Sequence, residues 1–514
     1  MLKKIGKFLT SRMAIVGSAI LLQAVILVLT IWQLSEYYVY LYAGFSLLSL
    51  IAVLFVLNRD DNPSYKLAWA IPIMLFPVFG GLFYLFFGAQ RTTKRFRQEL
   101  LEASVRTRPY LTADPQAKEH LAQTSRSRYN QSHYITRYSG FPLYEHTSTR
   151  YLTPGEEKFQ CLVEELKKAE HFIFLEYFII EEGIMWNTIL DILVEKVKAG
   201  VDVRLIYDDV GCLQTLPYKY NEKMESLGIR CEVFNPFKPA LKAIINNRDH
   251  RKIAVIDGHT AFTGGINLAD EYINAYPKHG HWKDASILIK GEAVWSFTIM
   301  FLQVWSVLRK EDASEDYEQF RPHRYHEAPF EGDGFVQPYG DCPLDNESVG
   351  ENVYLNIIAK ARNYVYIHTP YLIVDNELVT ALKLAAKSGV DVRIVTPHIP
   401  DKWYVHLMTR SYYGPLVEAG VKIYEYTPGF IHSKIFVSDD DTATVGTINM
   451  DYRSLYLHFE CGLWMCRNSS VGEVKADFLK TLENCRQITL EDCRNVKWYV
   501  RFMQALFRVF APLM

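Results

Sequence analysis

The side chains best suited to chemistry in this chain of 514 residues occur twice, in the pattern H-x-K-x4-D. The first copy comprises His250, Lys252 and Asp257, and the second comprises His432, Lys434 and Asp439. One copy alone would be a weak signal, because so short a pattern arises by chance. Both copies lie on apolar, strand-like runs, and both are followed at the same distance by two small residues, Gly264-Gly265 and Gly446-Thr447. This repetition makes the six motif residues the candidate catalytic set.

A histidine and a lysine from each copy could together break a phosphodiester bond. One neutral imidazole attacks the phosphorus to form a phosphohistidine, while the other donates a proton to the leaving oxygen and then accepts one from the incoming alcohol. The lysines stabilise charge on the phosphoryl oxygens. This chemistry needs no metal, and the eight cysteines lack the spacing of zinc ligands. The sequence therefore predicts neither a metal nor another cofactor.

The spacing within each motif predicts which side chains share a face. On a strand, residues two apart point to the same side, so each histidine lies beside its lysine. Asp257 and Asp439 fall five positions beyond the lysines, on the opposite face. We therefore expect these aspartates to orient the loop and the strand rather than to carry protons.

Four further residues are expected to complete the site. Asn267 and Asn449 follow the small pairs and could donate hydrogen bonds to the substrate phosphate. A catalytic histidine also needs a carboxylate on its second ring nitrogen to fix its tautomer. Asp284, downstream in the first copy, and Glu460, downstream in the second, are the candidates for this orienting role.

The alternative interpretation of each residue is structural. A single histidine on an apolar strand is more often a hydrogen-bonded core group, and a nearby lysine or aspartate is more often a surface charge. The repetition reverses this expectation for the motif residues. His279, His281 and His458 have no repeated partner and are interpreted as structural or surface groups.

The repeat extends beyond the motifs. The segment Gly200-Val-Asp202-Val-Arg204 precedes the first motif, and Gly389-Val-Asp391-Val-Arg393 precedes the second at a similar distance. Helix-like segments alternate with strand-like runs in both halves, at 156–169, 187–199 and 222–227 and again at 350–362, 376–387 and 404–419. This order predicts an α/β fold of two pseudo-symmetric halves, each a mixed sheet flanked by helices.

Apolar runs at 13–32, 38–57 and 67–87 each approach the length of a membrane-spanning helix. We expect retained transmembrane helices rather than a cleaved signal peptide. Basic residues on both sides of these runs conflict with a simple three-span topology, because cytoplasmic loops carry the excess of Lys and Arg. Either the third run is re-entrant or interfacial, or the first run inserts in the orientation that its basic residues disfavour. We expect the catalytic part on the cytoplasmic side, with the basic stretch after residue 87 against anionic headgroups. The net charge of −2 argues against nucleic acid as the partner.

Together these features divide the chain into six regions. They are a transmembrane segment (1–90), a basic connector (91–135), a first half (136–315), a surface connection (316–342), a second half (343–490) and a C-terminal amphipathic helix (491–514). The last helix either docks on the domain or contacts a membrane surface.

The motif copies, the N-terminal apolar stretch with Gly80-Gly81, and the phrase Gly429-Phe430-Ile431-His432-Ser433-Lys434 resemble the phospholipase D superfamily, and in particular the bacterial cardiolipin synthases. The resemblance covers essentially the whole chain. It implies two phospholipase D-like halves after a transmembrane segment in a bacterial cell membrane. It also implies transfer of a phosphatidyl group between two phosphatidylglycerol molecules, with glycerol released. His250 would be the nucleophile and His432 the acid and base, although the pseudo-symmetry also allows the reverse. Thr447 replaces the family's second glycine, which a turn without positive φ tolerates.

Two alternatives to a cardiolipin-forming enzyme remain from the sequence. One is a phospholipase D-type hydrolase, or a transphosphatidylase that uses another acceptor alcohol. The other is a catalytically inactive membrane scaffold, against which the intact motifs in both copies argue. The sequence predicts no particular oligomeric state.

Overall fold

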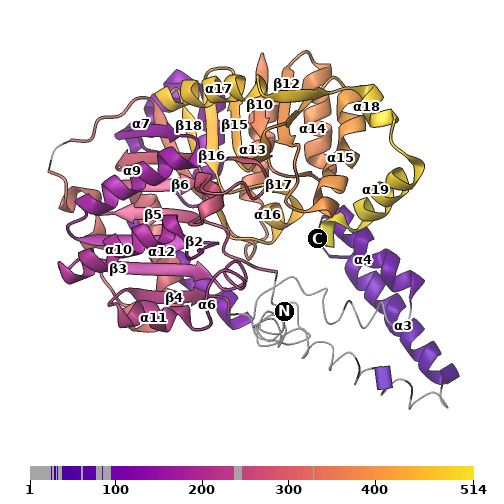
Figure 1. The fold of residues 1–514 in the computed structure, drawn as a ribbon, viewed down its shortest axis with the longest axis horizontal. Coiled ribbons are helices and arrows are strands. Elements are labelled where there is room, and N and C mark those ends of the chain that lie inside the picture. The colour runs from indigo at the N-terminus through magenta and orange to yellow at the C-terminus, as the bar shows by residue number, and fades with distance from the viewer. Residues whose placement is uncertain are drawn as a thin grey trace.

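Two mixed β-sheets pack around a shared apolar core, and helices lie on both the inner and the outer face of each sheet (Figure 1). The computed structural model describes residues 38–59, 62–76, 94–236, 246–327 and 329–513, together with residues 25, 28, 29, 32 and 84. This arrangement agrees with the predicted α/β fold of two halves.

The first sheet has seven strands in the order β1-β8-β6-β5-β2-β3-β4. Neighbours from β1 to β2 are antiparallel, and β2, β3 and β4 are parallel. The strands are β1 (Thr147–Leu152), β2 (Phe172–Tyr177), β3 (Asp202–Asp208), β4 (Arg230–Phe234), β5 (Lys252–Ile256), β6 (Thr260–Gly264) and β8 (Ser286–Gly291). Its helices are α9 (Gly155–Lys168), α10 (Ile184–Lys198), α11 (Tyr220–Ser226) and α12 (Val294–Leu308).

The second sheet repeats this order as β9-β18-β16-β15-β10-β12-β13 and adds β19 at one edge. Its strands are β9 (Phe335–Asp341), β10 (Tyr364–His368), β12 (Asp391–Pro397), β13 (Lys422–Tyr426), β15 (Ile435–Ser438), β16 (Thr442–Gly446), β18 (Glu460–Cys466) and β19 (Cys485–Ile488). Its helices are α13 (Val349–Lys360), α14 (Asn376–Lys387), α15 (Trp403–Glu418) and α17 (Ser469–Leu482). The motif strands β5 and β15 therefore occupy equivalent central positions.

Three apolar cores account for this layering. In β2, Phe172 and Phe174 point into a core shared by both sheets, while Ile173 and Leu175 point into an outer core with α9 and α10. Val365 and Ile367 of β10 likewise face the outer core beneath α13 and α14. A strand buried on both faces needs apolar residues at nearly every position, as these sequences have. The shared core fixes the two halves as one body.

Short elements complete the contact between the halves. Strand β7 (His281–Lys283) pairs with β14 (Gly429–Ile431), so that a segment of each half adds to the other. Strand β11 (Leu372–Ile373) pairs with β17 (Met450–Asp451), which leads into α16 (Tyr452–Tyr456). The turn η3 (Asp270–Ile273) follows Asn267 in the first half.

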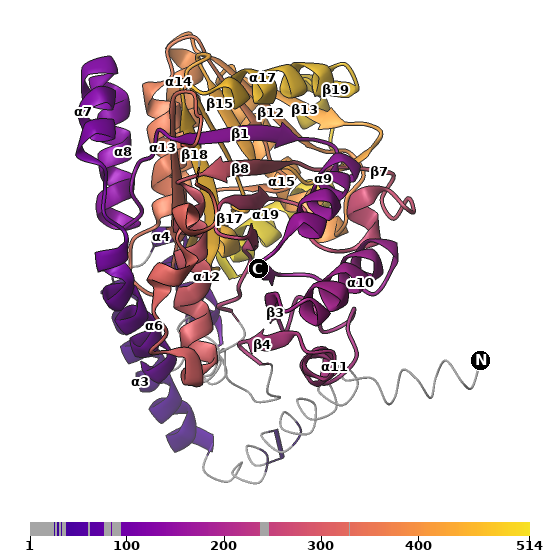
Figure 2. The ribbon, with the colours of Figure 1, turned by 90° about the vertical axis from the view of Figure 1, so that its left-hand side faces the viewer.

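Two predicted boundaries need correction. The expected surface connection, 316–342, contains β9, which pairs with β18 at the edge of the second sheet. The expected connector, 91–135, is largely helical, with α6 (Lys94–Thr107), α7 (Pro115–Thr124) and α8 (Arg126–Tyr138), and α6 packs on α12 (Figure 2). The helices bury only one face, and β9 is an interrupted sequence with Pro338 and Gly340 whose burial depends on its partner β18.

The N-terminal helices α3 (Tyr38–Leu57) and α4 (Pro63–Leu75) pack on each other around a small apolar core (Figure 1). Asn62 caps α4 and its side chain also donates to Asp375 and to Tyr456 of the second half, at 3.0 Å each. Among the described residues, no helix combines the length and apolar composition needed to cross a membrane. The predicted transmembrane segment is thus unsupported there, and the run at 13–32 lies almost wholly outside the described residues.

The C-terminal region forms α18 (Leu490–Arg494) and α19 (Trp498–Phe510). Helix α19 packs against α15 and α4, while Trp498 and Phe502 remain exposed. The amphipathic helix is therefore docked on the domain through one face only.

Candidate active site

Each motif histidine is held by the backbone of the opposite half. The amide of His250 donates to the carbonyl of Phe459 at 2.9 Å, and the amide of His432 donates to the carbonyl of Lys283 at 2.7 Å. The residue after each of these carbonyl groups is one of the two predicted orienting acids. The same backbone contact therefore places a carboxylate beside each imidazole.

The two acids serve the histidines in a crossed arrangement. Nδ1 of His250 lies 2.9 and 3.0 Å from the two carboxylate oxygens of Glu460. Nδ1 of His432 lies 2.7 Å from Oδ2 of Asp284. Each half thus supplies the histidine of its own motif and the carboxylate that contacts the histidine of the other half. The order of residues along the chain does not show this pairing.

With Nδ1 bound to a carboxylate, the other nitrogen of each ring is the reactive one. The hydrogen bond places the proton of a neutral imidazole on Nδ1 and leaves a lone pair on Nε2. Both rings are almost completely buried, with 6% of His250 and 7% of His432 exposed.

The lysines lie beside their histidines as the strand spacing predicted. Nζ of Lys252 donates to the carbonyl oxygen of His250 at 2.5 Å. Nζ of Lys434 lies 2.9 Å from Nδ1 of His432 and also donates to the carbonyl of His432. Each ammonium group is therefore held by the backbone of its own histidine, and that of Lys434 also lies against the imidazole.

The middle residue of each H-x-K points to the other face of the strand. Arg251 pairs there with Glu176 at 2.6 Å, and Ser433 lies 3.0 Å from Nδ1 of His368. Glu176 and His368 occupy corresponding positions on β2 and β10. These two buried pairs tie each motif strand to its neighbour.

Asp257 and Asp439 lie at the far end of their strands from the histidines. Asp257 accepts three backbone N–H groups, from residues 170, 171 and 172, each at 2.8 Å. Asp439 accepts the equivalent three from residues 362, 363 and 364, at 2.7 to 3.0 Å. Both aspartates have positive φ, 48° and 55°. These contacts hold the starts of β2 and β10, which is the orienting role that the spacing of the motif predicts.

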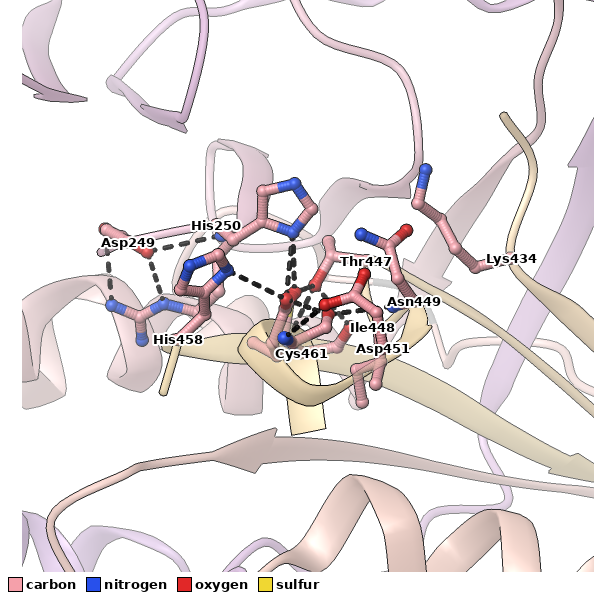
Figure 3. A network of polar contacts seen from close by, with 12 residues as sticks. Asp249, His250, Lys434, Thr447, Ile448, Asn449, Asp451, His458 and Cys461 are labelled. Carbon is pink, nitrogen blue, oxygen red and sulfur yellow. Dashed lines mark hydrogen bonds and ion pairs between the residues drawn. The ribbon is translucent and has the colours of Figure 1, made fainter. Parts of the chain in front are cut away.

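The two asparagines differ from one another. Oδ1 of Asn267 accepts from the amide of Ile179 at 3.0 Å, and Nδ2 donates to the hydroxyl of Tyr272 at 2.7 Å. Only one N–H of Asn267 is therefore left for a substrate. Oδ1 of Asn449 is buried and has no hydrogen-bond partner among the described residues, and Asn449 lies on the Lys434 side of the site (Figure 3).

The small pairs Gly264-Gly265 and Gly446-Thr447 differ in their second residue for a physical reason. A Cβ atom at Gly265 would lie 2.1 Å from Oδ1 of Asp284, so no side chain fits there. The equivalent Thr447, labelled in Figure 3, instead donates its hydroxyl to Glu460, as does Ser454. Thr447 is not among the residues with positive φ, so its replacement of glycine is tolerated as predicted.

Burial dominates the electrostatics of the four basic groups. It lowers the pKa of His432 to about 4, with Lys434 contributing, and holds the pKa of His250 well below its usual value. Burial also lowers the pKa of Lys252 to about 8 and that of Lys434 to about 7. Both imidazoles are therefore neutral at pH 7 in the free protein.

The two acids differ in charge. Burial raises the pKa of Glu460 to about 8 despite nearby Lys252. Burial would also raise the pKa of Asp284, but His432 and Lys434 outweigh it and hold that pKa below the ordinary value. Asp284 is thus ionised at pH 7, whereas burial disfavours the charged form of Glu460.

The surroundings of the two rings include residues that the sequence did not single out. Tyr272, Trp282 and Phe430 lie around His432, with ring centroids 5.4 to 5.9 Å away. Phe178 and His458 lie 5.0 and 5.6 Å from His250. Aromatic residues are common in cores, so only the position of His458, two residues before Glu460, could have drawn attention.

Comparisons with known proteins place this geometry in a family. The pattern described as "Cardiolipin synthase, PLD-like domain" matches residues 162–282 and 354–482, and "Phospholipase_D-nuclease N-terminal" matches residues 47–88. A cardiolipin synthase of Halalkalibacterium halodurans is 35% identical over 483 residues, covering 92% of this chain and 94% of the relative. The chain belongs to the cardiolipin synthase family. Membership in this phospholipase D-like family makes it a phosphatidyltransferase.

Other relatives agree with this placement. Cardiolipin synthase 2 of Bacillus cereus is 37% identical over 471 residues, covering 90% of this chain and 89% of the relative. A Streptococcus mutans protein without an assigned function is 44% identical over 466 residues, covering 90% of this chain and 99% of the relative. The crystal structure of phosphatidylserine synthase from Haemophilus influenzae superposes with a TM-score of 0.57 at 14% identity, covering 74% and 97% of the two chains. This last likeness concerns the fold.

Gly265→Ala tests whether Asp284 must lie against His432. The added methyl group is expected to displace the carboxylate, and a shift of about 1 Å in a supporting group can lower a rate roughly 100-fold. Gly472→Ala in α17 is the matched control, because a Cβ there meets nothing within 4 Å. Phosphatidyl transfer and thermal unfolding would be measured for both variants. Equal rates in the two folded variants would contradict the assignment.

Proposed function

We propose that this protein is a cardiolipin synthase, which transfers a phosphatidyl group from one phosphatidylglycerol to another through a phosphohistidine and releases glycerol. The observation that carries the proposal is the pair of crossed histidine–carboxylate contacts. They present two neutral imidazoles, each beside a lysine, from the two halves of one protein. Such a set supplies a nucleophile, a proton carrier and two cations for a phosphodiester.

The charge difference between the acids supports His250 as the nucleophile. An ionised Asp284 stabilises a positive imidazolium, so a proton is better held on His432. Glu460, with its raised pKa, gives less support to a charged His250. Neutral His250 attacks the phosphorus through Nε2, and His432 protonates the departing glycerol oxygen. His432 then removes the proton from the incoming hydroxyl group.

The substrate phosphate completes the charge balance. An anion between Lys252 and Lys434 raises the pKa of both lysines and of His432, because it stabilises their charged forms. The lysines then offset charge that develops on the phosphoryl oxygens. The side-chain N–H groups of Asn449 and the remaining N–H of Asn267 are the proposed donors to the phosphoryl oxygens. None of these steps uses a metal or another cofactor.

A lipid alcohol is the proposed acceptor rather than water. The rings of Tyr272, Trp282 and Phe430 surround His432, the group that would activate the acceptor. Such a site favours an alcohol delivered on an apolar chain, because it admits little water. Hydrolysis or transfer to another alcohol is the second candidate, and product analysis separates it from the first.

The proposed setting is the cytoplasmic side of a bacterial cell membrane, where an anionic bilayer supplies the substrate. Large apolar side chains are exposed on the N-terminal helices, including Phe55 at 60% and Met74 at 69%. Helix α19 exposes Trp498 at 80% and Phe502 at 62%, close to the basic Arg501. Such surfaces favour contact with anionic lipid. Multiple membrane spans and the cytoplasmic orientation remain part of this proposal, and nucleic acid is not a proposed partner.

Phosphatidylglycerol as the only lipid should suffice for the reaction. Protein in detergent with a chelator is expected to form cardiolipin and free glycerol in equal amounts, because the proposed mechanism uses neither water nor a metal. Lipid mass spectrometry and a glycerol assay measure both products, with His250→Ala as the inactive control. Phosphatidic acid as the sole lipid product would show a hydrolase, and loss of activity with the chelator would exclude the metal-free mechanism.

The lysine pKa values predict how the rate depends on pH. A lysine with a lowered pKa carries its charge below that pKa and loses it above. We therefore expect kcat/KM to fall as pH rises from about 7 to above 8, the values for Lys434 and Lys252. Initial rates at constant ionic strength measure the profile. A kcat/KM that stays constant up to the ordinary lysine range, about pH 10, would contradict charged, buried lysines in the mechanism.

A further inference from the structure

His458 has no explanation in the mechanism. It lies in the turn between α16 and β18, and its side chain is only 11% exposed. Neither ring nitrogen has a hydrogen-bond partner among the described residues. Buried polar groups are nearly always hydrogen bonded, and an exception suggests a missing ligand, ion or water.

The ring of His458 faces two groups of the active site. Its centroid lies 5.6 Å from that of His250 (Figure 3). Its Nδ1 lies 3.8 Å from Oε1 of Glu460. One ligand atom from each of His250, His458 and Glu460 lies within 4.8 Å of the other two. In a tetrahedral zinc site with bonds of about 2.1 Å, ligand atoms are about 3.4 Å apart. Small side-chain rotations therefore bring the three groups into binding distance.

The donor set selects the class of ion. Two imidazoles and one carboxylate suit borderline transition metals such as Zn²⁺, whereas Mg²⁺ and Ca²⁺ prefer oxygen ligands alone. Thr447 and Ser454 donate hydroxyl groups to Glu460 and hold its carboxylate in place. Such supporting hydrogen bonds are typical of protein metal sites.

We propose that His250, His458 and Glu460 form an inhibitory binding site for a borderline divalent transition metal, of which Zn²⁺ is the representative. The metal binds Nδ1 of His250 in place of the proton, and the ring then carries its proton on Nε2. Nε2 therefore has no lone pair with which to attack the phosphorus. The site makes the enzyme sensitive to free zinc although its reaction uses no metal. The inhibition rests on the proposed function, but binding of the metal does not.

Zinc binding and inhibition would be measured on the full-length protein in detergent after removal of metals by a chelator. Calorimetric titration with ZnCl₂ is expected to show one site per chain. The transfer rate should fall over the same range of concentration and recover on addition of chelator. Co²⁺ as a second probe should give the visible absorption of a site with nitrogen ligands.

His458→Gln and His458→Asn are the test variants, and His323→Gln is the matched control because His323 lies on an exposed surface. Each rate is compared with the metal-free rate of the same variant, and thermal unfolding shows that the variant is folded. Loss of one ligand should weaken zinc binding and inhibition by at least about tenfold, with no change for His323→Gln. Unchanged zinc affinity in a folded His458 variant, or no binding to the wild type, would overturn the proposal. If the wild type binds zinc through His458 but forms no cardiolipin, the metal site stands and the proposed function fails.

Discussion

Two crossed contacts between a histidine and a carboxylate organise this protein. Glu460 contacts Nδ1 of His250, and Asp284 contacts Nδ1 of His432. A backbone hydrogen bond between the halves lies beside each of these pairs. Neither half can assemble a complete site, because each lacks the acid for its own histidine. The shared core between the sheets is therefore a requirement of the chemistry as well as of stability.

The pseudo-symmetry of the halves is incomplete in a way that serves the reaction. The strand order and the motif positions correspond closely, yet the acids differ in length and in their neighbours. Glycine at position 265 makes room for Asp284, whereas Thr447 and Ser454 hold Glu460 with hydroxyl groups. Burial raises the pKa of Glu460, whereas His432 and Lys434 hold the pKa of Asp284 below its ordinary value. In the proposed mechanism this difference gives the two histidines separate roles.

Much of this organisation could be predicted from the sequence. The repeat, the two motif strands and the helix–strand order are local patterns, and α14 begins and ends at the predicted residues 376 and 387. The crossed pairing could not be predicted, because it depends on how the two sheets face each other. The helices of the basic connector and strand β9 were missed because their burial comes from tertiary contacts. His458 resembled an ordinary surface group until the structure placed it beside His250.

The phosphohistidine itself offers the most direct test of the central claim. Enzyme mixed with phosphatidylglycerol labelled in its phosphatidyl group would be quenched at alkaline pH, digested and mapped by mass spectrometry. Our account predicts label on the His250 peptide in His432→Ala and in Asp284→Asn, and none in His250→Ala. Label on His432 in the wild type would contradict His250 as the nucleophile. An Asp284→Asn variant without label, like His250→Ala, would contradict the pairing of Asp284 with His432.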